Sequence, residues 1–303
     1  MRIAILGAGG VGGYYGGLLA RGGHDVAFVA RGAHLAALRE HGLRVESVHG
    51  DFHVQPVRAG DDPAEIGPVD LVLVAVKNYD LASAAQAAGP LVGPDTAVLP
   101  LLNGLDADRR LAAVLGEGVV LAGLTHVSSS LAAPGLVQQI SAVRRITLGE
   151  RDGTETPRAR CIADALASAG IDVVLSDRIE VALWEKFLFI ASISGVCCLA
   201  RRPLGVVLAT AETRDLYLQA LREVEAVARA QDVALAPDLV ERTLALSDSF
   251  APETRPSMLV DLEAGRRLEL EALNGTVVRL GRSVGVATPV HAVAYAALKP
   301  AAG

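Results

Sequence analysis

The chain has 303 residues, of which 51% are hydrophobic and 20% are charged, and its formal net charge is −6. This length allows two domains with separate cores, and the composition excludes a disordered chain. A negative net charge without a basic tract argues against nucleic acid as a partner. Met1 opens the first apolar stretch directly, so no targeting signal is visible. We therefore expect a globular cytoplasmic protein.

Residues 2–21 carry the most informative motif. Residues 2–6 predict a buried parallel strand, and a helix is expected over residues 11–21. Between them lies a glycine-rich loop made of Gly7, Ala8, Gly9, Gly10, Val11 and Gly12. In such a unit the first glycine permits a tight turn, the second lets the backbone approach a pyrophosphate, and the third lets the helix pack closely on the strand. The pyrophosphate then lies at the positive end of the helix, so the motif predicts a dinucleotide-binding domain.

The second predicted strand, residues 25–30, is followed by Arg31. Proteins that bind NAD usually carry Asp or Glu at this point, where the carboxylate accepts a hydrogen bond from the ribose 2′-hydroxyl. A guanidinium instead suits the additional phosphate of NADP. The sequence therefore predicts NADP, with a solvated surface arginine and equal affinity for both cofactors as the alternative.

The rest of the first half alternates between strands and helices. We expect helices at 34–41 and 158–169, a hairpin from 43–47 and 52–57, and strands at 71–76, 96–102, 119–124, 144–149 and 172–175. Polar residues follow three of these strands, namely Lys77-Asn78, Asn103-Gly104 and Thr125-His126. Ligands of open α/β sheets bind outside the carboxyl ends of the strands, so these residues are site candidates.

The second half is predicted to be helical, with helices near 180–200, 212–231, 237–246, 257–284 and 289–298. We place the domain boundary near Ser176, which gives an α/β dinucleotide-binding domain over 1–176 and a helical substrate domain over 177–303. The expected active site is the cleft between them. The apolar run 187–200 has 14 residues, fewer than the ~20 of a membrane helix, so we expect a buried core helix and no membrane contact. The helix near 212–231 suits a homodimer face and packing within the domain equally well.

The three cysteines, Cys161, Cys197 and Cys198, form neither a disulfide framework nor a metal-binding pattern. Cys197 and Cys198 are expected to be small buried apolar residues in a reducing cytoplasm. The seven histidines show no ligand spacing, so the sequence predicts no metal.

Lys186 is the strongest catalytic candidate. Its face of the predicted helix also carries Leu183, Ile190, Ile193 and Cys197. A buried ammonium needs a partner, because an unpaired charge in an apolar environment is costly. The alternative is a lysine at the helix edge whose ammonium extends into water, beside Glu185.

Glu269 is the candidate partner of Lys186. On a continuous helix over 257–284, Glu269 shares one face with Leu273, Val277 and Leu280. A solvated glutamate in the first turn of a helix is the alternative. Two inward charges of opposite sign in one helical domain favour an ion pair, which makes them a candidate functional site.

A dinucleotide domain and a lysine in the second domain suggest hydride transfer to a carbonyl group. The developing alkoxide needs a proton donor, and a free lysine, with a pKa of about 10.4, is protonated at neutral pH.

These residues together resemble the ketopantoate reductases (2-dehydropantoate 2-reductases) over nearly the whole chain. The resemblance lies in Gly7-Ala-Gly-Gly-Val-Gly12, Ala30-Arg31-Gly32, residues 34–39, Val76-Lys77, Leu102-Asn103-Gly104, Thr125-His126, residues 183–187, residues 257–262, and Glu269 with Leu273-Asn274-Gly275. It implies a Rossmann-type NADP-binding domain followed by an all-α domain similar to the C-terminal domain of 6-phosphogluconate dehydrogenase.

The resemblance also implies catalytic roles. Lys186 matches the proton donor of the family. Glu269 matches the acidic residue that orients the lysine and touches cofactor or substrate. Asn103 matches the asparagine between the nicotinamide and the substrate hydroxyl, although Asn-Gly is also a common turn sequence.

Binding roles follow in the same way. Arg31 matches the arginine that contacts the 2′-phosphate of the cofactor. Lys77 matches a lysine that lies near cofactor and substrate, and Val127 matches a position whose backbone contacts the cofactor. Ser257 matches the hydroxyl that holds the substrate carboxylate, with a helix N-cap as the alternative.

The chain departs from the family pattern at three positions of the substrate site. Ile190 and Ser194 stand where characterised members carry asparagines one and two turns after the lysine, and Thr254 replaces a third. The loss of amide donors makes the pocket more apolar and weakens its discrimination of a hydroxyl. A bulkier or less polar 2-oxo acid is therefore an alternative substrate.

Three functional hypotheses result. The first is NADPH-dependent reduction of 2-dehydropantoate to (R)-pantoate in pantothenate biosynthesis, in which Lys186, Ile190, Ser194 and Ser257 contact the substrate. The second is a paralogous reductase of another 2-oxo acid or carbonyl compound with the same mechanism. The third, from a different class, is a sensor that binds NADP without turnover.

Overall fold

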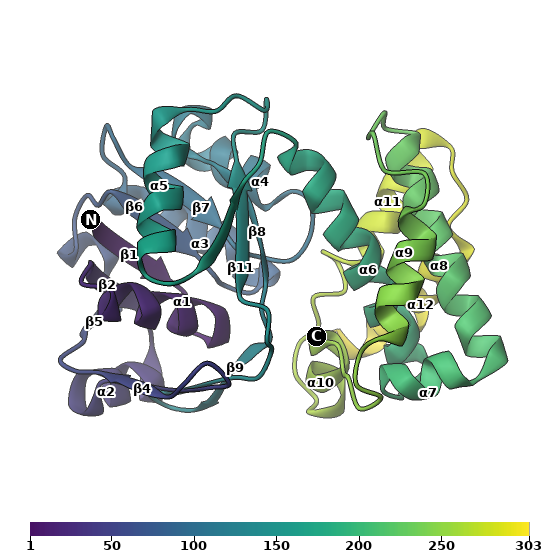
Figure 1. Ribbon diagram of the computed structural model, residues 1–303, viewed down its shortest axis with the longest axis horizontal. Helices are drawn as coiled ribbons and strands as arrows, with labels where there is room; N and C mark the ends of the chain where they lie inside the picture. Colours follow the sequence, from purple (N-terminus) through teal and green to yellow (C-terminus); the bar gives the residue numbers. More distant parts are fainter. Residues whose placement is uncertain (303) are drawn as a thin grey trace. The chain divides into compact units, whose positions relative to one another are not determined.

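The structure is a computed structural model that describes residues 1–302, and the chain divides into two compact units (Figure 1). The sheet unit consists of Met1–Leu102 and Asp106–Ile179. The helical unit consists of Asn103–Leu105 and the chain from Glu180 onward. The segment Asn103–Leu105 therefore groups with the helices, although a strand of the sheet unit ends only a few residues before it.

The central sheet of the sheet unit is fully parallel, with the strand order β5-β2-β1-β6-β7. Its strands are β1 (Arg2–Leu6), β2 (Asp25–Val29), β5 (Arg58–Gly60), β6 (Leu71–Val74) and β7 (Ala97–Pro100). Helices of this unit are α1 (Gly10–Arg21), α2 (Gly32–His41), α3 (Leu81–Ala87), α4 (Ala107–Leu115) and α5 (Pro157–Ser168). This order and the alternation of strand and helix confirm the predicted Rossmann-type fold.

Alternate residues of β1 face opposite layers of the sheet unit. Ile3 and Ile5 belong to a core shared with α1 and α5, whereas Ala4 and Leu6 belong to a core shared with α3 and α4. Side chains of a strand point alternately to its two faces, so a strand buried on both sides is apolar at nearly every position. This explains the continuous apolar runs in the sequence.

The sheet unit contains two further sheets. Strands β3 (Leu43–Ser47), β4 (Phe52–Val54), β9 (Ser129–Ala133) and β10 (Leu136–Gln139) form one with the order β4-β3-β10-β9. Strands β8 (Ala122–His126), β11 (Arg145–Gly149) and β12 (Asp172–Leu175) form the other, with the order β12-β11-β8. The β3–β4 hairpin was predicted, whereas β9 and β10 were not. In addition, β8 extends to His126, beyond the predicted strand end.

Glycines on α1 allow a strand to approach the helix closely. A Cβ at Gly10 would lie 2.5 Å from the carbonyl oxygen of Ser129 in β9, and one at Gly13 would lie 2.7 Å from a methyl carbon of Val137 in β10. On another side of α1, a Cβ at Gly12 would lie 2.1 Å from the Gly7 oxygen. The glycines of this segment therefore serve sheet packing as well as the loop.

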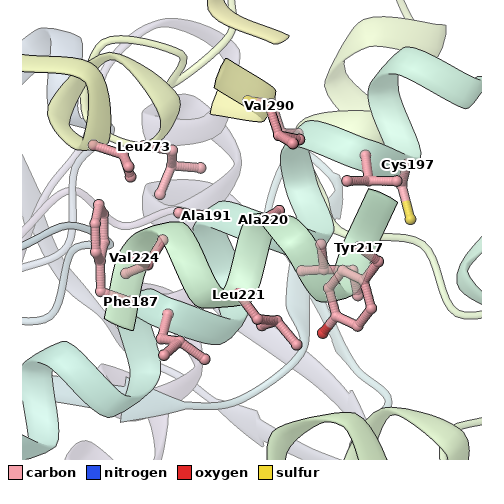
Figure 2. Packing of buried hydrophobic residues seen from close by; sticks show 14 of the residues in the cluster. Phe187, Ala191, Cys197, Tyr217, Ala220, Leu221, Val224, Leu273 and Val290 are labelled. Carbon is pink, nitrogen blue, oxygen red and sulfur yellow. The ribbon is translucent and has the colours of Figure 1, made fainter. Parts of the chain in front are cut away.

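The helical unit is built around α6 (Ile179–Ala200), which begins at the last residue of the sheet unit. The other helices are α7 (Leu204–Ala209), α8 (Ala211–Arg229), α9 (Leu239–Asp248), α10 (Ser257–Glu263), α11 (Asn274–Val284) and α12 (Pro289–Leu298). In Figure 2, buried side chains of α6 and α8 pack together, among them Phe187, Ala191, Tyr217 and Val224.

α6 is long and apolar enough to cross a membrane by length and composition, but 67% of its apolar window is buried inside the protein. This burial agrees with the predicted core helix. Cys197 and Cys198 are buried in the core of the helical unit, as expected for small apolar residues, and burial raises the pKa of each thiol to about 12. Cys161 is exposed.

The predicted helix over 257–284 is wrong, because α10 ends at Glu263 and α11 begins only at Asn274. Gly265 adopts a left-handed conformation with φ +64° just after α10. The N–H group of Arg266 then donates to the Asp261 carbonyl, and its side chain donates to the Asp261 carboxylate at 2.8 Å. This arrangement closes the helix, so the turn that carries Glu269 is separate from both helices.

Candidate active site

The glycine-rich loop leaves room for an anion at the start of α1. Gly7 has φ +99°, and a Cβ there would lie 2.8 Å from the Val76 side chain, so only glycine fits. In contrast, a Cβ at Gly9 would have no atom within 4 Å. Gly9 is also the N-cap of α1 and provides no side-chain cap for the first N–H groups of the helix. Uncapped N–H groups beside open space fit a bound pyrophosphate.

His34 lies beside this loop, and no role was predicted for it. Its Nε2 is 2.7 Å from the carbonyl oxygen of Ala8, and the N–H group of Gly135 donates to its Nδ1 at 3.0 Å. The imidazole is half-buried, and this burial lowers its pKa. No sequence signal reveals such a contact, because Gly135 is far from His34 along the chain.

Arg31 is the N-cap residue of α2, with an extended backbone and an exposed side chain. Within residues 1–302 its guanidinium forms no ion pair or side-chain hydrogen bond. It is therefore available to a phosphate, and it lies two residues after the end of β2, the strand that neighbours β1.

The remaining candidates of the sheet unit follow the carboxyl ends of strands. Lys77 is half-buried and lies between β6 and Leu81, the first residue of α3. Val127 follows β8 and packs against the core that α1 and α5 share with the sheet. Within β8, the hydroxyl of Thr125 hydrogen bonds with that of Tyr15 at 2.5 Å, which ties the strand to α1.

Lys186 lies on α6 and keeps part of its surface exposed. The protein around it replaces water, which lowers the pKa of its ammonium to about 8, and the nearby Glu269 carboxylate opposes this by raising the pKa. The two residues therefore influence each other electrostatically, and their assignment as a functional pair stays a prediction. An ammonium with this pKa is protonated at neutral pH and gives up its proton more readily than a free lysine.

Glu269 belongs to the turn before α11 and not to a helix, which corrects the predicted helical face. Its side chain is buried, with 7% of its surface exposed. Its carbonyl accepts hydrogen bonds from the N–H groups of Ala272, at 3.2 Å, and Leu273, at 3.1 Å. The carboxylate is thus held by a hydrogen-bonded turn inside the protein.

Asn103 is half-buried and belongs to the helical unit, as do Lys186 and Glu269. The next residue, Gly104, has φ +109°, a conformation that favours glycine, and the Asn-Gly pair lies in a bend of the chain. Leu105 packs against the helical core and anchors this short segment.

The positions that depart from the family pattern differ in exposure. Ile190 is half-buried one turn after Lys186, whereas Ser194 is fully buried. The Ser194 hydroxyl has no hydrogen-bond partner among residues 1–302. Ser257 is exposed as the first residue of α10, whose N-cap is Pro256, so the N-cap alternative for Ser257 is wrong. Thr254 is half-buried in the preceding loop, where its carbonyl accepts from the Leu204 N–H group at 2.9 Å.

A buried polar network, which was not predicted from the sequence, joins four helices. Asn274 donates to the Ala191 carbonyl at 3.3 Å and lies 2.9 Å from Nδ1 of His291. Nε2 of His291 is 3.1 Å from the carbonyl oxygen of Ala220. The Glu223 carboxylate accepts hydrogen bonds from the backbone N–H groups of Val290, at 2.7 Å, and His291, at 3.0 Å, in the first turn of α12. The network therefore fixes α11, directly after the Glu269 turn, against the helix that carries Lys186.

Both halves of the chain match models of one family. Residues 3–153 match the model of ketopantoate reductase PanE/ApbA, and residues 178–302 match the model of its C-terminal part. The uncharacterized oxidoreductase YkpB of Bacillus subtilis is 34% identical over 301 residues, which cover 99% of this chain and 98% of that protein.

Solved structures of similar proteins agree with these family matches. The crystal structure of 2-dehydropantoate 2-reductase from Geobacter metallireducens is 36% identical, with a TM-score of 0.94, and the match covers 99% of this chain and 100% of that one. The ternary structure of D-mandelate dehydrogenase with NADH and anilino(oxo)acetate has a TM-score of 0.91 over 100% of this chain and 98% of that one. At 22% identity this second likeness shows the fold alone. The chain therefore belongs to the ketopantoate reductase PanE/ApbA family of oxidoreductases.

Proposed function

We propose that this protein reduces 2-dehydropantoate to (R)-pantoate with NADPH, and that Lys186 protonates the substrate oxygen. The observation that carries the proposal is the ammonium of Lys186. Burial lowers its pKa to about 8, and the Glu269 carboxylate opposes part of this shift by raising the pKa. Perturbed ionisable groups of this kind cluster at functional sites. The family and the name of the Geobacter metallireducens relative supply the substrate class.

In the proposed reaction the bound dinucleotide supplies a hydride to the carbonyl carbon of the substrate. Lys186 first polarises the carbonyl oxygen through its positive charge. As the carbon–oxygen double bond becomes a single bond, a proton of Nζ moves to the oxygen and leaves a neutral amine. That amine regains a proton from solvent before the next turnover. Glu269 favours the charged form of Lys186 and so keeps the proton donor protonated.

The cofactor preference rests on Arg31 and on the loop at Gly9. The pyrophosphate is common to NADH and NADPH, so Gly9 and the start of α1 serve both. Only NADPH carries a phosphate for the exposed guanidinium of Arg31. We expect a lower Kd for NADPH, and we expect Arg31→Ala to remove most of the difference. Equal Kd values in the wild type would contradict the role of Arg31.

Substrate contacts are assigned to the helical unit and to the residues near Lys186. Ser257 and the first N–H groups of α10 would hold the substrate carboxylate, and Asn103 would contact the substrate hydroxyl. Ile190 would line the remaining pocket, whereas Ser194, one turn further along α6, is fully buried. Ile190 retains accessible surface, so it presents methyl groups where the family pattern has an amide.

Ile190 favours a second candidate function, which is the reduction of a bulkier or less polar 2-oxo acid by the same mechanism. An apolar side chain forms no hydrogen bond with a substrate hydroxyl, so it weakens selection for 2-dehydropantoate. The fold neighbour named D-mandelate dehydrogenase is described with an aromatic oxo acid, which makes aromatic compounds worth including in a test.

The test is NADPH oxidation with 2-dehydropantoate beside a panel of branched and aromatic 2-oxo acids. The highest kcat/KM for 2-dehydropantoate would support the proposed function. A clear preference for another 2-oxo acid would support the second candidate and keep the Lys186 mechanism. Tight NADPH binding without turnover of any compound would instead indicate the non-catalytic sensor.

A further inference from the structure

His34 connects two loops of the sheet unit that are far apart in the sequence. On one side it contacts the Ala8 carbonyl inside the glycine-rich loop, and on the other it contacts the N–H group of Gly135 between β9 and β10. The carbonyl of Gly135 accepts from the N–H group of Arg44 at 2.9 Å, so this turn is itself fixed to β3. The imidazole is therefore a bridge between the glycine-rich loop and a rigid part of the second sheet.

The partners of His34 determine which ring nitrogen carries the proton. A backbone N–H group can only donate, so Nδ1 is the acceptor toward Gly135. Nε2 must then carry the hydrogen that is donated to the Ala8 carbonyl. A neutral imidazole has one donor and one acceptor, and the lowered pKa of His34 keeps it neutral at pH 7. Both nitrogens are thus used by backbone groups.

This contact fixes the direction of a second backbone group in the loop. The Ala8 carbonyl and the Gly9 N–H group belong to one planar peptide, and in a trans peptide they point in opposite directions. Holding the carbonyl toward His34 therefore turns the Gly9 N–H group to the other side. Gly9 is the residue at the start of α1 whose Cβ position is open.

We propose that His34 is a positioning residue for the dinucleotide, which orients the Ala8–Gly9 peptide so that its N–H group faces the pyrophosphate. The proposal rests on the proposed cofactor binding. A phosphate is stabilised by N–H groups and repelled by a carbonyl oxygen, so the orientation of this peptide changes affinity. Because NADH and NADPH share the pyrophosphate, His34 affects both cofactors equally, unlike Arg31.

Two variants separate the two hydrogen bonds of His34. His34→Gln places an amide N–H group near the position of Nε2, so it can still donate to Ala8 but no longer accepts from Gly135. His34→Asn places an amide oxygen near the position of Nδ1, so it can accept from Gly135 but does not reach Ala8. Each variant loses one hydrogen bond, and we expect similar losses of thermal stability.

The experiment measures the Kd of NADPH and of NADH by calorimetry for the wild type and both variants. We expect His34→Asn to weaken both cofactors by about tenfold, the scale of one hydrogen bond of ~1.4 kcal/mol. The NADPH-to-NADH ratio should remain that of the wild type. His34→Gln should stay within about threefold of the wild type, because its donor to Ala8 is retained.

Equal Kd values for the two variants, or a larger loss in His34→Gln, would overturn the positioning role. A wild type that binds neither cofactor would overturn the proposed function together with this inference. A second measurement uses the folded wild type alone and needs no variant. The ¹⁵N spectrum of the His34 ring should show a proton on Nε2, and a proton on Nδ1 instead would also overturn the proposal.

Discussion

For Lys186, the sequence indicates the helical face on which the residue lies, whereas its pKa depends on the folded structure. Its apolar helical face was visible in the sequence, and in the structure the Glu269 carboxylate raises its pKa against the effect of burial. The size and direction of its pKa shift were not accessible, because they depend on how much water the surrounding elements remove. The helix pattern identifies the candidate, and the packing determines its acidity.

The Lys186–Glu269 pair leads to a prediction about pH dependence. Loss of the Glu269 carboxylate in Glu269→Gln removes the effect that raises the pKa of Lys186, so this pKa should fall below about 8. Lys186 acts as an acid, so kcat should fall as pH rises through its pKa, and in the variant this fall should occur at lower pH.

This pKa is directly measurable because the chain has only three lysines, Lys77, Lys186 and Lys299. Lysine labelled with ¹³C at Cε gives three titrating signals to follow by NMR. Glu271→Gln is the matched control, because Glu271 is exposed and pairs with Lys299 and Arg279. An unchanged Lys186 titration in Glu269→Gln would disprove the electrostatic link.

His291 leads to a prediction about stability. Burial lowers its pKa to about 4, from 6.5 in an unfolded chain. The unfolded state therefore binds the proton more readily, so this contribution to stability is complete above pH 6.5 and is lost as pH falls toward 4. Between pH 7 and pH 5 the loss should be about 2 kcal/mol in the free energy of unfolding.

Urea unfolding at these two pH values checks this contribution. The difference between the two values should be smaller by about this amount in His291→Gln than in the wild type. The exposed His49 provides the control, and His49→Gln should retain the wild-type difference. The same pH dependence in His291→Gln and the wild type would show that His291 does not contribute.

Polar partners were the least predictable feature at the residue scale. His34 and Asn274 belong to quoted sequence motifs, yet their contacts with Gly135 and His291 join segments that only the fold brings together. Hydrophobic periodicity reports which face is inward but carries no information on which carbonyl a buried imidazole meets.

At the scale of elements, the error at Glu269 has a clear cause. Apolar residues at 258, 259, 262, 273, 277 and 280 continue a helical period across a break. The signal for the break is Gly265, which takes a left-handed conformation after α10. An isolated glycine is tolerated inside many helices, so the pattern alone did not separate α10 from α11.

Strands β9 and β10 were missed for a related reason. β9 has the sequence SSLAA and is largely exposed, so it lacks the apolar alternation of a half-buried strand. Its partner β10 also pairs in parallel with β3, a contact between distant parts of the chain. The central strands were found because burial on both faces makes them continuously apolar.

Adjacent glycines at the start of α1 provide a prediction for this element. Gly9→Ala should fold with nearly unchanged stability, because its Cβ meets no atom within 4 Å, but the added methyl group should obstruct the pyrophosphate. Gly10→Ala should lose about 1–3 kcal/mol of stability, because its Cβ would lie 2.5 Å from the Ser129 carbonyl.

Thermal unfolding together with NADPH binding distinguishes the two glycine variants. Loss of cofactor affinity with retained stability is expected for Gly9→Ala, and loss of stability is expected for Gly10→Ala. Tight NADPH binding by Gly9→Ala would show that the open space at Gly9 is not where the pyrophosphate lies.

For the whole molecule, the order of elements made the fold predictable. Strand–helix alternation with a glycine-rich first turn leaves few topologies, because parallel strands need crossover connections of one hand. The sequence did not show that Asn103–Leu105 groups with the helices, because this depends on packing of Leu105 against the helical core. Asn103 thereby joins Lys186 and Glu269 in one compact unit.

The central claim is that Lys186 supplies the proton for carbonyl reduction, and one comparison tests it most directly. Lys186→Ala and Lys299→Ala are assayed for NADPH oxidation with the best 2-oxo acid of the panel, and the Kd of NADPH is measured for both. Lys299 is exposed and pairs with Glu271, so its variant should match the wild type. Lys186→Ala should retain its NADPH affinity and lose about 10²–10⁴-fold in kcat. A Lys186→Ala variant that turns over at the wild-type rate would contradict the account.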